Sequence, residues 1–320
     1  MRLCGSKNCF PQRRKESSKD YFGILIRFVR REISARIRRT IRGLRFVRQI
    51  IVAKIVGGQE MSKPKIHFAH ANGFPAGTYT KLFSFLADDF DIDYLTRHGH
   101  NPQFPVTDNW KFLRDELRAE IERRYAEKII GVGHSLGGLL HFLVAVENPE
   151  LYRQIILLDA PVISRLSSHG VRILKITGLM DRFSQSKVTR ARRNLWRSRE
   201  EAFEHFKKKP KFDAFDEDVL RDYVRFGTVR AAEGFELFFS PLIESKIYRT
   251  LPDHLPTFRG KLKIPTAYVG GSRSKEGELA RLSFMKKHFP VDFYQIEGSH
   301  LYPFEKPQAT AEIIKNIAKR

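Results

Sequence analysis

Cysteine is almost absent from this chain. The two cysteines among 320 residues, Cys4 and Cys9, both lie close to the N-terminus. Neither a disulfide framework nor a cysteine-ligated metal site can therefore hold the rest of the chain together. The histidines show no H-x-x-x-H spacing either. We expect no metal and no other cofactor.

Long apolar runs and acidic residues are also scarce. No uncharged apolar stretch reaches 18 residues, so no membrane-spanning helix is predicted. Lys and Arg number 58 against 36 Asp and Glu, which gives a formal net charge of +22. The excess is uneven, because residues 1–60 hold 16 basic and 4 acidic residues, a charge of +12.

The basic excess follows a helical period between residues 21 and 56. Apolar residues recur there at every third or fourth position, and arginines fill much of the remainder. A helix of this kind suits the surface of an anionic membrane. The arginine-rich composition is also typical of an organelle transit peptide. Alternatively, Met61 is the natural start and residues 1–60 do not belong to the protein.

From residue 65 onward, strand-like and helix-like segments alternate. Strands are predicted at 65–70, 90–95, 128–132, 154–159, 264–271 and 291–297. The pattern predicts an α/β fold with a mostly parallel central sheet flanked by helices. A basic, helix-rich stretch over 161–260 interrupts the alternation and is too long for a loop. We therefore expect a basic N-terminal extension (1–60), an α/β core (61–160 and 261–320) and a helical cap inserted into that core (161–260).

The stretch Gly133-His134-Ser135-Leu136-Gly137 has the spacing G-x-S-x-G. It follows a strand-like run and precedes a helical one. In a nucleophile elbow, the serine occupies the strained turn between strand and helix, and the glycines permit close packing. A tight turn without catalytic function has the same pattern, so the motif alone leaves both interpretations open.

Three stretches together resemble the α/β-hydrolase family: "HFAHANGFP" (67–75), "GHSLGG" (133–138) and "IEGSHLYPFEKP" (296–307). The resemblance covers about residues 62–320 and implies a six-stranded version of that fold. It implies Ser135 as nucleophile and His300 as general base. The backbone N–H groups of Leu136 and of the turn at Asn72, Gly73 and Phe74, most directly Phe74, would hold the oxyanion.

The third member of the triad is missing from its usual place in that family. The stretch after the penultimate strand, "GGSRSKEGE", has no aspartate and offers only Glu276 or Glu278. Asp159 ends the preceding strand "QIILLD", at the same edge of the sheet as Ser135. We predict that Asp159 is the triad acid, with Glu276 or Glu278 as the alternative and a turn-capping role for Asp159 as another.

The resemblance implies a serine hydrolase that acts on a small carboxylic ester. A thioesterase, an amidase or a C–C bond hydrolase would use the same triad, and a non-catalytic binding protein is the alternative from another class. The cap holds a basic run that is either a solvated face or an attractor of acidic substrates: Arg190, Arg192, Arg193, Arg197, Lys207, Lys208 and Lys209. No nucleic-acid-reading motif accompanies the arginines, so no nucleic-acid partner is expected. We expect a cytoplasmic protein, peripheral at the membrane through residues 21–56.

The periodic segment at 21–56 yields a first prediction. The full chain should bind anionic vesicles in cosedimentation, and the bound fraction should fall as salt rises, because screening weakens the attraction of the arginines. A chain that starts at Met61 should bind much less while hydrolysing substrate equally well. Equal vesicle binding by the two chains would contradict the assignment.

Overall fold

The computed structural model describes residues 63–280 and 282–320, and the amphipathic segment predicted at 21–56 lies outside this range. Residues 63–320 form one compact unit. Its centre is a sheet of six strands, which run parallel in the order β2-β1-β3-β4-β8-β9. The strands are β1 (Lys65–Ala69), β2 (Asp91–Tyr94), β3 (Ile129–His134), β4 (Tyr152–Leu158), β8 (Thr266–Gly271) and β9 (Asp292–Ile296). All six strands were predicted from the sequence, and the predicted fold class is confirmed.

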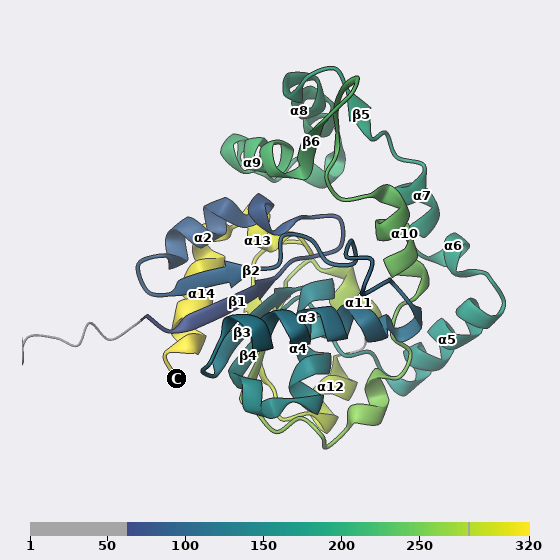
Figure 1. The fold of residues 1–320 in the computed structure, drawn as a ribbon. Coiled ribbons are helices and arrows are strands. Elements are labelled where there is room, and N and C mark those ends of the chain that lie inside the picture. Colours follow the sequence, from purple (N-terminus) through teal and green to yellow (C-terminus); the bar gives the residue numbers. More distant parts are fainter. Residues whose placement is uncertain (1–62, 281) are drawn as a thin grey trace, which may run out of the picture. The chain divides into compact units, whose positions relative to one another are not determined.

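Helices cover both faces of this sheet (Figure 1). One face carries α2 (Thr80–Leu86) and α14 (Pro307–Ala318), which pack against each other. The other carries α3 (Lys111–Arg124), α4 (Leu136–Glu147) and α12 (Ser283–His288). Because strand side chains alternate between faces, Ile156 and Leu158 join the first apolar cluster whereas Ile155 and Leu157 join the second. Shorter helices are η1 (Ala76–Tyr79), η2 (Asp108–Trp110), η3 (Pro149–Leu151), α11 (Lys275–Ala280) and α13 (Tyr302–Glu305).

The segment between β4 and β8 is mostly helical, as predicted, but it also contains a small antiparallel sheet. Its helices are α5 (Arg165–Ile176), α6 (Met180–Phe183), α7 (Ser186–Arg190), α8 (Arg199–Lys207), η4 (Pro210–Phe212), α9 (Glu217–Gly227), α10 (Pro241–Arg249) and η5 (Leu255–Phe258). The sheet joins β5 (Leu195–Trp196), β7 (Gly234–Leu237) and β6 (Thr228–Ala231). Two residues connect β6 to β7, a hairpin signal that the sequence analysis missed. The division into core and cap stays a prediction.

The inserted segment packs over the part of the core that follows β1. Helix α9 contacts η1 and α2, and Figure 1 shows α8 and α9 on the same side as α2. Aromatic side chains of the segment join the apolar cluster of that face: Trp196, Phe203, Phe206, Phe212 and Tyr223. The insertion therefore forms part of the environment at one edge of the sheet.

That edge is the carboxyl end of the parallel strands, where the residues that follow different strands come together. The packing there is tight. A Cβ at Gly137 would lie 2.0 Å from the carbonyl oxygen of Ala69 in β1, and a Cβ at Gly133 would lie 2.4 Å from the backbone of Gly137. Glycine is therefore required for helix α4 to begin this close to β1 and β3.

The close contact at Gly137 predicts a severe local effect. Gly137→Ala should lower the free energy of unfolding by about 1–3 kcal/mol or more, because the methyl group meets backbone that cannot move aside. Gly170→Ala is the matched control, since nothing lies within 4 Å of the added methyl in α5. It should raise the free energy of unfolding by about 0.5–1 kcal/mol, the usual helix preference for alanine. Urea unfolding measures both, and equal stability of the two variants would contradict this packing account.

Candidate active site

Ser135 occupies the turn between β3 and α4. Its φ is 52° and its ψ is −113°, a conformation that non-glycine residues rarely adopt. The Ser135 N–H donates to the carbonyl of Leu158 at 2.9 Å, which continues the pairing of β3 with β4. The structure therefore has the strained strand-turn-helix geometry predicted from the spacing of the two glycines.

His134 connects three loops at this edge. Its Nδ1 lies 2.7 Å from the hydroxyl of Tyr79, which in turn accepts from the Ala71 N–H at 3.1 Å. Its Nε2 lies 2.8 Å from the backbone carbonyl of His300. Burial lowers the pKa of His134 to about 3, so the ring is neutral. A neutral ring whose Nε2–H donates to a carbonyl must accept from Tyr79 at Nδ1, and this defines the direction of the chain of hydrogen bonds.

The loop that carries His300 is held by a buried carboxylate. Glu305 in α13 accepts from the Ser299 N–H at 3.0 Å and from the Ser299 hydroxyl. Gly298 just before has a φ of 149°, and a Cβ there would lie 2.6 Å from the Cβ of Tyr302. This arrangement directs the His300 ring back towards the elbow, where it packs against His134 with 5.1 Å between ring centroids.

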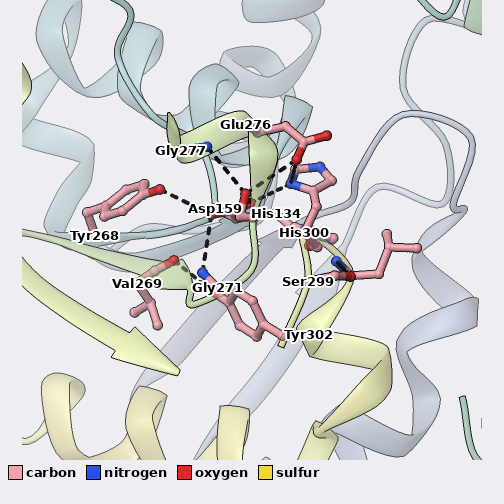
Figure 2. Close-up of polar contacts among 12 residues, drawn as sticks. His134, Asp159, Tyr268, Val269, Gly271, Glu276, Gly277, Ser299, His300 and Tyr302 are labelled. Atoms are coloured by element: carbon pink, nitrogen blue, oxygen red, sulfur yellow. Dashed lines mark hydrogen bonds and ion pairs between the residues drawn. The ribbon is translucent and has the colours of Figure 1, made fainter. Parts of the chain in front are cut away.

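Asp159 and His300 are brought together, as the prediction requires. Asp159 follows β4 with a φ of 45°, and its Oδ2 lies 2.6 Å from Nδ1 of His300. Figure 2 shows the carboxylate directly beside the His300 ring. Because a carboxylate only accepts, we infer that His300 carries its proton on Nδ1, which leaves Nε2 free to accept a proton.

The Asp159 carboxylate is buried, yet it is stabilised in its ionised form. The residue is 1% exposed, and it accepts from the Tyr268 hydroxyl at 3.1 Å, the Gly271 N–H at 3.3 Å and the Ser274 hydroxyl. Burial alone would raise the pKa of Asp159. The hydrogen bond and charge of His300, with the bond from Ser274, outweigh burial and lower that pKa.

The two alternative acids lie differently. Glu276 Oε2 is 3.8 Å from Nδ1 of His300 and 3.3 Å from the Ser274 hydroxyl, but its side chain is 49% exposed (Figure 2). Glu278 is exposed, and none of the ion pairs or hydrogen bonds among the described residues joins it to His300. The geometry therefore places Asp159 closest to the histidine, with Glu276 as a second, water-exposed carboxylate.

The predicted oxyanion donors lie at two backbone turns. The Leu136 N–H is the first amide of α4 and has no partner within the helix. The Phe74 N–H, predicted as the second donor, instead donates to the Ala71 carbonyl at 3.0 Å. Gly73 has a φ of 78° in this turn, and no hydrogen bond among the described residues uses the N–H of Asn72 or Gly73. These two amides are available in this conformation, whereas that of Phe74 is not.

Ser135 and His300 lie at the same edge of the sheet but are not hydrogen-bonded. Within the described part of the chain, His300 bonds to Asp159 and His134, and no hydrogen bond joins it to the Ser135 hydroxyl. Contacts of this kind often tighten only when substrate binds. Asp159, His300 and Glu276 also form the one acid and histidine cluster within the described residues whose atoms approach closely enough for a metal ion. The bond between His300 and Asp159 already accounts for that proximity.

Several groups at this site were not identified from the sequence. Tyr268 and Ser274, which hydrogen-bond to Asp159, have no distinguishing motif. The same is true of Arg192, Lys211 and Glu244, which the inserted segment brings to the turn at Gly73. These residues can be identified only from contacts in the folded structure, although the sequence analysis recognised the basic run that includes Arg192.

Comparison with known proteins agrees with this architecture. A curated protein of Haemophilus influenzae named "Putative esterase/lipase" is 22% identical over 271 residues, which are 82% of this chain and 85% of that protein. The crystal structure of E-2-(acetamidomethylene)succinate hydrolase matches with a TM-score of 0.63 and 20% identity, over 81% of this chain and 92% of that one. The thioesterase domain from the curacin biosynthetic pathway matches with a TM-score of 0.60 and 15% identity, over 79% of this chain and 91% of that one.

A family model covers most of the described chain. The model described as "Alpha/beta hydrolase family" matches residues 68–313, a range that begins in β1 and ends in α14 and so includes the elbow and the His300 loop. Together with the parallel sheet and the elbow, this match shows that the chain belongs to the α/β-hydrolase family.

Proposed function

We propose that this protein is a serine hydrolase that cleaves carboxylic esters through an acyl-enzyme. The observation that carries the proposal is the 2.6 Å contact between Asp159 and Nδ1 of His300, at the edge of the sheet where Ser135 occupies a strained elbow. A buried carboxylate that orients a histidine at the edge that also holds a serine hydroxyl is the arrangement that activates a serine nucleophile.

Each group then has one chemical task. His300 Nε2 takes the proton of the Ser135 hydroxyl while the serine oxygen attacks the ester carbonyl. The oxyanion is held by the N–H of Leu136 and one N–H of the 72–73 turn. As the intermediate collapses, His300 returns the proton to the leaving alcohol, and water repeats the sequence to release the acid. Asp159 stays ionised throughout and stabilises the imidazolium.

Alternatives within the same chemistry differ in the leaving group. The same three residues would cleave a thioester or an amide, and the comparisons include proteins named as an esterase/lipase and a thioesterase. We favour the ester because the curated relative carries that name. A protein that only binds a ligand would not need Asp159 to remain ionised in a buried position, so the pairing with His300 favours catalysis.

We also propose peripheral membrane association. No helix among residues 63–280 and 282–320 is long and apolar enough to cross a bilayer. Support comes from the stretch α5–α7, where large apolar side chains are exposed beside exposed basic ones: Leu166, Ile173, Ile176, Phe183 and Val188 with Arg165, Arg172, Arg182, Lys187 and Arg190. Apolar and basic groups side by side suit an anionic lipid surface.

Loss of the nucleophile tests the proposal first. Ser135→Ala should lower kcat for p-nitrophenyl ester hydrolysis by several orders of magnitude, because the acyl-enzyme cannot form. It should also abolish labelling by a fluorophosphonate probe while circular dichroism stays unchanged. Activity within tenfold of the parent chain would remove Ser135 from the mechanism.

The acid is tested by a matched pair of substitutions. Asp159→Asn keeps the shape and removes the charge, so kcat should fall by about 10³–10⁴-fold, as for other triad aspartates. Glu276→Gln should change kcat by less than about tenfold, because its carboxylate is solvated and farther from Nδ1. The same ester assay measures both variants. The opposite order of effects would assign the acid to Glu276.

A further inference from the structure

Lys211 brings a positive charge to the turn that follows β1. It lies in η4, and its ammonium is 4.6 Å from the centre of the Phe74 ring. The side chain is exposed, yet protein surrounds the ammonium closely enough that desolvation lowers the pKa of Lys211. Within the described residues it forms no ion pair at hydrogen-bonding distance. The contact with Phe74 therefore places the ammonium beside the turn that follows β1.

Arg192 and Glu244 lie at the same turn. Arg192 Nη2 is 2.6 Å from Oε2 of Glu244, and Glu244 is 2% exposed. The carboxylate of Glu244 packs on Gly73, where a Cβ would lie 2.4 Å from Oε1, and its backbone carbonyl accepts from the Asn72 side chain at 3.1 Å. Nε and Nη2 of Arg192 are buried and make no hydrogen bond of good geometry, although the Tyr223 hydroxyl lies beside the guanidinium. The guanidinium is therefore only partly satisfied.

The charges at this turn do not balance. Lys211 and Arg192 contribute two positive charges, and Glu244 offers one negative charge in return. Glu276 is close enough to influence the Lys211 charge, but it is half exposed and belongs to the surroundings of His300. A desolvated cation without a partner is unfavourable. One further anion at this position would pair the excess charge and supply acceptors to Lys211 and Arg192.

We propose that Lys211 and Arg192 bind an anionic group of the substrate, so that this site prefers esters with a carboxylate or phosphate a few bonds from the reacting carbonyl. The inference rests on the proposed function and names its substrate class. The anionic group must be near the reacting carbonyl because Lys211 contacts Phe74 and Arg192 pairs with Glu244 at Gly73. Phe74 and Gly73 belong to the turn that offers the oxyanion donors. Lys208 and Lys209 of the basic run are also exposed, but neither lies over the Phe74 ring as Lys211 does, so they attract anions without selecting among them.

The test compares two esters of equal length. The mono-p-nitrophenyl ester of succinic acid and p-nitrophenyl butyrate both have a four-carbon acyl group, but only the first carries a carboxylate. The full-length parent chain should show a higher kcat/KM for the anionic ester, and this advantage should shrink as salt rises. Lys211→Met should lower the ratio of the two kcat/KM values by about 10- to 100-fold, the usual effect of losing a charged hydrogen bond.

A control variant separates this specific contact from general attraction. Lys209→Met removes the same charge two residues away, where no contact with Phe74 holds the side chain at the turn, and it should leave the ratio unchanged. An equal effect of Lys209→Met and Lys211→Met would overturn the inference, because it would show a diffuse field. A parent chain that hydrolyses both esters equally well would overturn it as well, while leaving the serine hydrolase itself intact.

Binding without turnover keeps the inference testable if ester hydrolysis fails. In the Ser135→Ala chain, monomethyl succinate should bind more tightly than methyl butyrate by calorimetry, and Lys211→Met added to that chain should abolish the difference. Competition by inorganic phosphate or by succinate distinguishes the two kinds of anion. Anion binding through Lys211 without fluorophosphonate labelling of the parent would reject the proposed function alone. Equal binding of the two methyl esters would reject the inference.

Discussion

A fully buried carboxylate organises the carboxyl edge of this sheet. Asp159 has almost no contact with solvent, and an ionised carboxylate in such a position is costly unless donors surround it. The donors come from separate parts of the chain: Tyr268 and Gly271 in β8, Ser274 just after it and His300 after β9. The need to satisfy one charge therefore fixes the loops after β8 and β9 relative to β4, and it orients the histidine at the same time.

A neutral histidine performs a similar structural task on the other side of the elbow. His134 joins the turn after β1, through Tyr79, to the backbone of His300. Because burial keeps its ring uncharged, it completes these bonds without adding a second cation beside His300. The elbow is thus held from both sides, by Asp159 through the His300 ring and by His134 through the His300 backbone. This support explains how strained conformations at Ser135 and Asp159 persist in one small region.

Much of this fold could be predicted from the sequence, because its signals are local. The six strands and the helix after the elbow follow from short apolar runs and glycine spacing, whereas the roles of Ser135 and His300 were implied by the resemblance to the α/β-hydrolase family. The pairing of Asp159 with His300 was predicted because residues that follow parallel strands lie at the same edge of the sheet, although β8 separates β4 from β9. The second oxyanion donor is different: whether Phe74 or Gly73 offers a free N–H depends on the turn type, which the letters "NGFP" do not determine.

The inserted segment was the least predictable part, and the reason is physical. Its strands β5–β7 are two to four residues long, too short for a periodic signal. Its functional contacts depend on how α10 and η4 pack over the core. Glu244 and Lys211 are more than 130 residues from the turn that they contact, so no local pattern joins them to it. A basic run could be recognised from composition, but only the fold separates Arg192, at Glu244, from its exposed neighbours.

The central claim is that Ser135 becomes covalently acylated during turnover. The most direct measurement is a reaction with a p-nitrophenyl ester that is quenched with acid within milliseconds, followed by mass spectrometry of the peptides. The account predicts an added acyl group on the peptide that contains Ser135, localised to that serine by fragmentation, together with a burst of p-nitrophenol of about one equivalent per active site. Steady turnover without any acyl group on Ser135 would contradict it.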